Sequence, residues 1–170
     1  MRGLFPKTTQ YNPAVRAYRA TDFPAVAEVY ALARPLEFQN EATDLKLLPL
    51  SEDPEVLERF HRNRLLVFEQ QGIIKGFAGY EKDYIGWLYV HPAYQGQKIG
   101  RTLLQILFKQ MSVPQVRLSL VNSNHTAKKL YKSLGFVELE TFPFEMQGQV
   151  IEGVRMARIT VQENTYLKRG

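Results

Sequence analysis

The stretch of residues 88–104 constrains the fold of this chain more than any other. An apolar run leads into Pro92, which cannot donate a hydrogen bond to a sheet ladder, so a strand should end there. A polar loop carries Gly96 and Gly100, and apolar residues then recur at spacings of three and four, which predicts a helix. Strand, glycine loop and helix together can cradle an anion, because the unpaired amides at a helix start converge and the helix dipole favours negative charge.

Two basic residues strengthen this interpretation. Lys98 and Arg101 fall in the first turn of the predicted helix, where the dipole alone would favour acidic side chains. We therefore interpret the loop as a phosphate site. A glycine loop between a strand and a helix is also commonly no more than a tight turn, and this motif by itself leaves both interpretations open.

Composition excludes several kinds of site. The 170 residues include no cysteine, which excludes disulfides, zinc–thiolate sites and a cysteine nucleophile. The three histidines are scattered along the chain, so we expect no metal. No apolar run approaches the roughly 18 residues of a membrane span, and the first residues lack the apolar core of a signal peptide. We expect a cytoplasmic protein without a membrane partner.

The net charge of +5 permits nucleic-acid binding without requiring it. No run of basic residues is longer than two, and no aromatic–basic repeat of the kind that tracks single strands is present. An anionic small ligand explains the charge equally well. We therefore expect no nucleic-acid partner.

Length and patterning predict a single domain over residues 1–170, in which 1–13 form a loose arm. Alternation predicts strands at 15–20, 64–70, 73–81, 83–90 and 115–121, and a final hairpin of 136–144 and 150–159. Helical spacing predicts helices at 21–33, from 53 onward, at 99–109 and at 124–134. Residues 35–50 have no clean period and are predicted to form a mobile lid or substrate loop. The expected fold is α/β (α+β): a mixed, mostly antiparallel central sheet of about six to seven strands, flanked by about four helices, with a crossover helix into a parallel strand.

A second motif occupies residues 124–136. Its apolar spacing predicts one buried helix face, and Tyr131 adjoins that face, so its ring can be buried while its hydroxyl reaches the edge of a cleft. Gly135 lies just past the predicted helix, where a left-handed cap is expected. Taken alone, this motif favours a core tyrosine at a helix–sheet junction.

Taken together, the two stretches resemble the GNAT N-acetyltransferase superfamily. The first family signature, Gln/Arg-x-x-Gly-x-Gly/Ala, corresponds to residues 95–100. The second, Asn-x-x-Ala-x-x-Leu-Tyr-x-x-x-Gly-Phe, corresponds to residues 124–136 without exception, and the resemblance extends in order from about residue 15 to 160. Lys98 stands at the usual first glycine. A helix-starting residue tolerates a side chain if its φ is negative, and we expect Lys98 to meet that condition.

The resemblance implies acetyl-CoA as cosubstrate and no metal. Backbone amides of residues 95–101 would hold its pyrophosphate. The strand ending at Val90 would splay from the parallel strand at 115–121, and the pantetheine arm would enter the gap like an added strand. An amide near Leu88 would polarise the thioester carbonyl, and Asn124 would bond to the amide arm. The implied coenzyme-binding residues are Leu88, Tyr89, Val90, Gln95, Gly96, Gln97, Lys98, Ile99, Gly100, Arg101, Asn124 and Tyr131.

The implied chemistry needs two proton transfers. A base or a water chain must take a proton from the acceptor, because an alkyl amine with a pKa of about 10 is mostly protonated at neutral pH. An acid must protonate the leaving thiolate, and the resemblance assigns that role to Tyr131. For the base we favour Glu81, with Asp83 and His91 as alternatives, although each of these can equally be a solvated turn charge.

We therefore predict an N-acetyltransferase that moves the acetyl group of acetyl-CoA to a primary amine of a small molecule, an amino acid or antibiotic, or a protein N-terminus or lysine. The loop at 37–50, with Glu37 and Glu41 as candidate contacts, and the hairpin at 142–151 would shape the acceptor pocket. The alternative is a non-catalytic acyl-CoA sensor of the same fold, which has no need of Tyr131. A nucleic-acid-binding domain would leave both signatures unexplained. The exposed final strands offer a surface for a homodimer.

Overall fold

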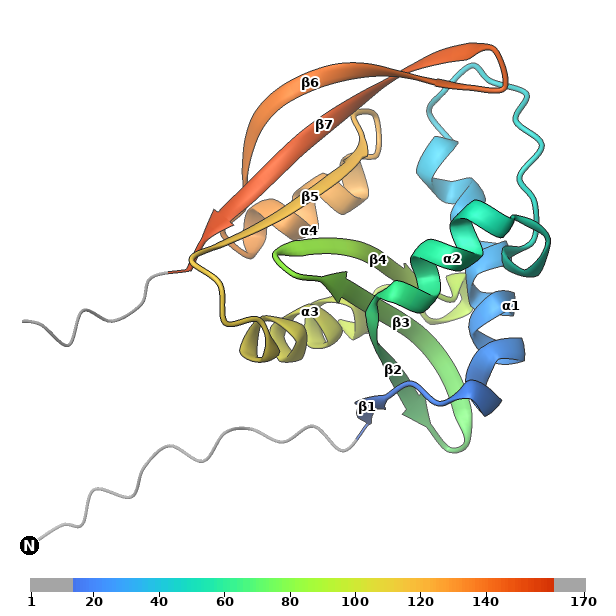
Figure 1. The fold of residues 1–170 in the computed structure, drawn as a ribbon, viewed down its shortest axis with the longest axis vertical. Coiled ribbons are helices and arrows are strands. Elements are labelled where there is room, and N and C mark those ends of the chain that lie inside the picture. Colours follow the sequence, from blue (N-terminus) through green and yellow to red (C-terminus); the bar gives the residue numbers. More distant parts are fainter. Residues whose placement is uncertain (1–13, 161–170) are drawn as a thin grey trace, which may run out of the picture.

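The structure is a computed structural model that describes residues 14–160, so the predicted arm at 1–13 lies outside the described residues. Within them the chain forms a seven-stranded sheet in the order β1-β2-β3-β4-β5-β7-β6 (Figure 1). The strands are β1 (Val15–Ala17), β2 (Arg64–Gln70), β3 (Ile73–Glu81), β4 (Tyr84–Val90), β5 (Gln115–Val121), β6 (Val137–Met146) and β7 (Gln149–Ile159). The helices are α1 (Phe23–Ala33), α2 (Pro54–Arg62), α3 (Ile99–Gln110) and α4 (His125–Ser133), with 3₁₀ turns η1 (Ala20–Asp22), η2 (Arg34–Phe38), η3 (Leu50–Glu52) and η4 (Pro92–Tyr94). The predicted mixed sheet with flanking helices is confirmed.

Local sequence signals set the ends of these elements. Gly135 ends α4 with a φ of +90°, as predicted for a left-handed cap. The first helix was predicted to end at residue 33, and α1 does end there, but the chain continues through Pro35 as η2. Proline is tolerated there because the first residues of a helical turn need no backbone donor. This ordered turn carries Arg34 and Glu37, the second of which lies in the segment 35–50 that was predicted to be irregular.

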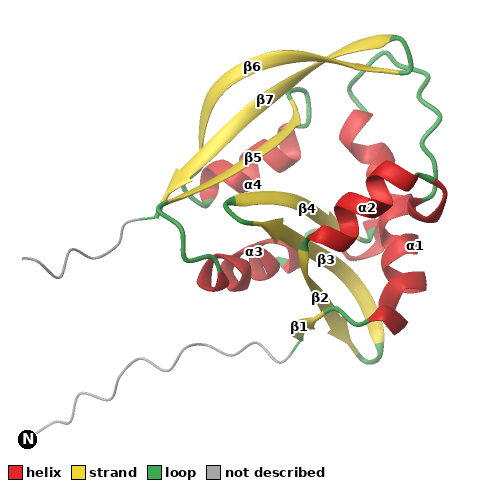
Figure 2. Ribbon diagram, viewed as in Figure 1, coloured by secondary structure: helices red, strands yellow, loops and turns green. Residues whose placement is uncertain are grey.

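Alternation of side chains places the sheet between two helical layers (Figure 2). In β2, Leu66 and Phe68 pack into the core shared with α3, whereas Val67 between them packs into the core shared with α1 and α2. Each core therefore uses every second residue of β2, as the period-two pattern predicts. Within residues 14–160, no helix is both long and apolar enough to cross a membrane.

The parallel strands β4 and β5 are joined at one end only. Among the described residues, Tyr84 opposite Arg117 is their single paired position. The Arg117 amide also donates to the Asp83 carbonyl at 2.8 Å, so the join is confined to the start of β4. α3 supplies the crossover between the two strands. The expected splayed parallel pair is thereby confirmed, and it leaves the rest of the β4 edge without a β5 partner.

The β6–β7 hairpin forms one edge of the sheet, and the loop at 39–49 runs beside its tip (Figure 1). The Gln147 side chain accepts from the Lys46 amide at 2.9 Å and donates to the Lys46 carbonyl at 2.7 Å. The Asp44 amide donates to Gln149 Oε1 at 3.3 Å. A small buried cluster joins η2, β5 and β7 nearby, made of Phe38, Val121 and Ile151. The loop predicted as a lid is therefore fastened to the hairpin tip.

Candidate active site

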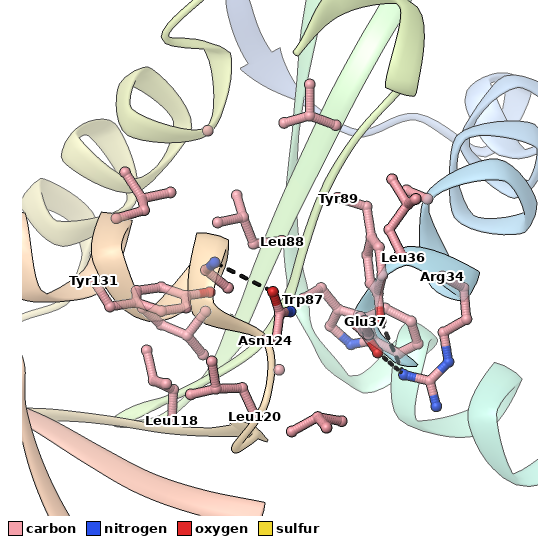
Figure 3. A pocket seen from close by; sticks show the side chains of 18 of the residues that line it. Arg34, Leu36, Glu37, Trp87, Leu88, Tyr89, Leu118, Leu120, Asn124 and Tyr131 are labelled. Carbon is pink, nitrogen blue, oxygen red and sulfur yellow. Dashed lines mark hydrogen bonds and ion pairs between the residues drawn. The ribbon is translucent and has the colours of Figure 1, made fainter. Parts of the chain in front are cut away.

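A cleft with a volume of about 850 Å³ opens where β4 and β5 separate. Figure 3 shows Tyr131 on one side and Arg34 and Glu37 on the other, with Leu88 of β4 and Asn124 between them. The start of α3 also lines the cleft, and β6 contributes three apolar side chains, Phe142, Phe144 and Met146. The two sequence motifs therefore meet at one cavity, although a crossover helix and a strand separate them in the chain.

The glycine loop before α3 forms part of this cleft. Gly96, which lines it, has a φ of +78°, so this turn uses the left-handed region that glycine tolerates best. Lys98 also lines the cleft, and its φ is +62°. The expectation of a negative φ at Lys98 is therefore wrong. The turn needs this conformation whichever residue occupies it, and a residue with a Cβ there costs roughly 1–2 kcal/mol.

The amino terminus of α3 keeps its first amides available to a ligand. Lys98 is the N-cap residue and makes no side-chain cap, and the first amides of an α-helix have no partner within the helix. Arg101 Nη2 donates to Ser133 Oγ at 2.6 Å, which ties this turn to the end of α4. Open amides beside two basic side chains are the arrangement that an anion cradle needs.

Tyr131 projects from α4 into the cleft with only 7% of its surface exposed. Its ring packs edge-on against Phe136, with 5.5 Å between ring centroids. Burial raises the pKa of Tyr131 well above its usual value, and the negative charge of Glu37 on the other wall raises it further. The hydroxyl is therefore held in its protonated form, which is the form that can donate.

Asn124 caps α4 and lines the cleft. Its Oδ1 accepts from the Ala127 amide at 3.3 Å, as Figure 3 shows. Because the oxygen serves the helix, the Nδ2 group is the part of this side chain that can donate to a ligand.

A β-bulge determines which of the two helical layers each side chain of β4 faces. The register between β3 and β4 shifts near the start of β4 and leaves Gly86 as an extra residue. After the bulge, Trp87 and Tyr89 pack against α1 and α2, whereas Leu88 and Val90 face the core of α3 and α4. The predicted site residue Tyr89 thus has its side chain on the opposite layer from Leu88 and Val90, and it can meet a coenzyme in the gap only through its main chain.

The wall of the cleft that η2 forms, here called the η2 wall, carries a charged cluster. The sequence did not predict that these side chains meet. Arg34 Nη1 pairs with Glu37 Oε2 and donates to the Tyr89 hydroxyl at 3.3 Å. The Arg34 guanidinium lies over the rings of Tyr30 and Phe38, 5.9 and 5.1 Å from their centroids. Burial and the charge of Glu37 raise the pKa of Tyr89. The Arg-x-x-Glu spacing was the available signal, because residues three apart adjoin on a helical turn.

The two acidic candidates for the base, Glu81 and Asp83, have different surroundings in the structure. Glu81 lines the cleft, but 42% of its side chain is exposed and its Oε2 lies 3.8 Å from Arg62 Nε. Asp83 pairs with Arg117 at 2.6 Å outside the cleft, and that hydrogen bond lowers the pKa of Asp83. A carboxyl group with a lowered pKa is a poor proton acceptor at neutral pH, so Asp83 is the weaker candidate.

Two other predicted candidates lie outside the cleft lining. His91 Nδ1 accepts from the Ala93 amide at 3.0 Å, and Glu41 accepts from Ser123 Oγ at 2.5 Å. Both side chains therefore have structural partners in the loops that they occupy. Between residues 14 and 160, no group of three or more His, Asp or Glu side chains is placed to hold a metal ion.

The sequence of this chain is similar to those of known proteins. The family model described as an acetyltransferase (GNAT) domain matches residues 49–159. A curated relative, the L-methionine sulfoximine/L-methionine sulfone acetyltransferase of Salmonella typhimurium, is 31% identical over 91 residues. That match covers 46% of this chain and 53% of the relative, so the chain spans about half the length of the curated relative that it matches.

Solved structures share the fold over most of the chain. A GCN5-related N-acetyltransferase from Rhodopseudomonas palustris has a TM-score of 0.72 at 22% identity, covering 88% of this chain and 97% of its own. The ribosomal-protein-S18-alanine N-acetyltransferase of Escherichia coli has a TM-score of 0.67 at 26% identity, covering 89% and 97%. The yncA protein of Salmonella typhimurium, solved with its cofactor acetyl-CoA, has a TM-score of 0.69 at 21% identity, covering 89% and 96%.

Proposed function

Because this chain belongs to the GNAT acetyltransferase family, we propose that it transfers the acetyl group of acetyl-CoA to a primary amine. The gap between β4 and β5 is the observation that carries the proposal. It brings the unpaired edge of β4, the start of α3 and the hydroxyl-bearing side chain of Tyr131 to one cleft. These are a groove for an extended arm, a cradle for phosphates and a proton donor.

The coenzyme would be held mainly by backbone groups. Its pyrophosphate would lie on the amides of residues 95–101, and because each charge–helix interaction contributes only about 0.3–1 kcal/mol, several must act together. Lys98 and Arg101 add positive charge beside them. The pantetheine arm would pair with the main chain of Leu88 and Val90, where β4 has no partner strand. Asn124 would donate from Nδ2 to a carbonyl of the arm.

The acetyl transfer proceeds by direct attack. The acceptor enters as an ammonium group and loses one proton, and its nitrogen then attacks the thioester carbon. An amide of β4 near Leu88 would stabilise the negative charge that develops on the carbonyl oxygen. The C–S bond breaks, the thiolate gains a proton from Tyr131, and the second proton that the nitrogen loses returns to the Tyr131 oxygen. One proton ends on sulfur and one passes to solvent. Of the predicted bases, Glu81 is the one that lines the cleft.

The relatives support an amine acceptor. The Salmonella relative is named for methionine sulfoximine and methionine sulfone, and the Escherichia coli neighbour for an alanine of a ribosomal protein. The feature that these acceptors share is a primary amine. We therefore extend only that feature to this chain.

Two measurements test the proposal. Calorimetric titration should give micromolar binding of acetyl-CoA, with ATP much weaker. Thiol release from acetyl-CoA with an amine panel should then detect turnover, and Tyr131→Phe should lower it at least about tenfold, with acetyl-CoA affinity nearly unchanged. Equal turnover in that variant would show that another group protonates the thiolate. Binding without thiol release for any amine would favour the acyl-CoA sensor instead.

A further inference from the structure

The ion pair on the η2 wall presents both signs of charge to the cleft. Both side chains line the cavity, with 22% of Arg34 and 25% of Glu37 exposed. The side-chain hydrogen bonds that Arg34 makes with the described residues all come from Nη1, which leaves Nε and Nη2 to donate elsewhere. A carboxylate offers about four acceptor positions, so Glu37 can accept from a ligand while it stays paired.

The pair is held rigidly. Both residues lie on the single turn η2, three positions apart, and the guanidinium lies over the rings of Tyr30 and Phe38. The buried side chain of Tyr89 receives a further hydrogen bond from Arg34 at 3.3 Å. The two charges therefore keep a fixed separation and a fixed direction before any ligand arrives. Groups fixed in advance lose less entropy on binding than mobile ones do.

A neutral oxygen in the same cleft also lacks a donor. Asn63 Oδ1 is buried and has no hydrogen-bond partner among the residues that the structure describes. Its orientation is set by Nδ2, which donates to the Arg59 carbonyl at 2.6 Å. The oxygen lies beside the bulge of β4, 3.2 Å from where a Cβ on Gly86 would stand. Buried acceptors are almost always paired, so this one points to a ligand N–H or an ordered water.

We propose that the acceptor is a small zwitterion of the amino-acid type, whose ammonium group binds Glu37 and Asn63 and whose carboxylate binds Arg34. This inference rests on the proposed acetyl transfer. An α-amino acid carries its two opposite charges on groups bonded to one carbon, and the Arg34–Glu37 pair presents the complementary charges side by side. In this arrangement Glu37, in place of Glu81, takes the first proton and later passes it to solvent: an N–H bond breaks, an O–H bond forms on the carboxylate, and the nitrogen lone pair becomes free to attack.

A second arginine–glutamate pair in the cleft serves as a matched control. Arg62 and Glu81 line the cavity too, but their side chains are 51% and 42% exposed and the closest atoms are 3.8 Å apart. Arg62 also pairs with Glu58 at 3.2 Å. Solvent screens such a pair and leaves its geometry loose, so it is poorly suited to select a ligand by charge.

The first test needs no variant. L-methionine and L-phenylalanine are each compared with their amides as acceptors, by thiol release from saturating acetyl-CoA. The amide keeps the amine but loses the carboxylate, and its amine is less basic, which favours the amide chemically. We expect kcat/KM at least tenfold higher for the acids. Equal rates, or faster amides, would overturn the inference and favour a protein N-terminus. Absence of thiol release with every amine tried would instead overturn the proposed function.

Variants then locate the two charges. Glu37→Gln should lower kcat/KM at least tenfold for acids and amides alike, whereas Arg62→Gln, in the more exposed pair, should change it less than twofold. Arg34→Gln should bring the acid-to-amide ratio close to one, and Arg34→Lys, which keeps the charge, should retain part of it. Asn63→Leu should raise the KM of the acceptor. Acetyl-CoA affinity, measured by calorimetry, should be unchanged in all five and shows that each is folded. If both Arg34 variants keep the wild-type ratio of kcat/KM for acid to kcat/KM for amide, or if Glu37→Gln keeps full activity, the roles given to these two residues are wrong.

Discussion

Gly76 in β3 lies where the sheet approaches the start of α3. A Cβ at this position would stand 2.9 Å from the Tyr89 carbonyl oxygen and 3.1 Å from Ile99 Cγ2. The oxygen belongs to the paired backbone of β4, and Ile99 is the buried first residue of α3, so neither can move without shifting an element. We predict that Gly76→Ala destabilises the protein by about 1–3 kcal/mol, the usual cost of overpacking a core. The strand preference of alanine over glycine opposes this by only about 0.5–1 kcal/mol, so the steric effect decides the sign.

Thermal unfolding measures the effect. For a chain of this size each kcal/mol lowers the midpoint by about 2–4 °C, so a fall of about 2–12 °C is expected. Acetyl-CoA affinity should fall as well, because Ile99 opens the helix that would hold the phosphates. Gly100→Ala is the matched control: its nearest contact would be Leu130 Cδ2 at an ordinary 3.4 Å, and a helical glycine replaced by alanine should gain about 0.5–1 kcal/mol. An unfolding midpoint for Gly76→Ala at or above the wild-type value would show that α3 does not pack closely against the backbone of Gly76.

Two further substitutions test the loop and the N-terminal ion pair. Lys98→Gly should remove the left-handed strain and raise the unfolding midpoint, yet weaken acetyl-CoA binding by roughly two- to fivefold at low salt. Calorimetry at low and high salt checks this, and equal affinity at low salt would mean that the ammonium does not serve the phosphates. Asp22 accepts from Arg16 at 2.8 and 2.9 Å and from the Arg19 amide at 2.7 Å, and the bond with Arg16 lowers the pKa of Asp22. This stabilisation is complete above the unfolded pKa near 3.9 and is lost as pH falls through the lower folded value, so Asp22→Asn should cost about 1.5–3 kcal/mol at pH 7 and progressively less in strong acid. Urea unfolding across that range would contradict the argument if the difference stayed constant.

Part of the candidate site was readable in the sequence because its signals are short-range. The loop at 95–101 and the motif at 124–136 each contain their own turn, cap and helix, so their residue types identify them, and Lys98, Asn124 and Tyr131 all line the cleft. The family resemblance that they carried is confirmed by the match over residues 49–159. The roles of these residues in binding and catalysis stay predictions until the measurements above are made.

Other parts of the site join residues that lie far apart in the chain. Arg34 meets the hydroxyl of Tyr89 across 55 positions, and no local pattern encodes such a contact. The orphan oxygen of Asn63 likewise becomes visible only once β4 lies beside it. The φ of Lys98 was mispredicted because a lysine normally avoids the left-handed region, and the need of the surrounding turn overrode that preference.

The sequence alone determined the kinds and the order of the elements, because periods of two and of three to four residues, prolines, caps and hairpin turns act over a few residues. It also identified the two segments that carry the family signatures. The tertiary structure decided what those segments face. The single pairing at Tyr84 opens the cleft, and the bulge at Gly86 turns Tyr89 toward Arg34 and Leu88 toward Tyr131. Both depend on backbone pairing between distant strands, whose balance of hydrogen bonds and packing is settled only when the whole sheet has formed.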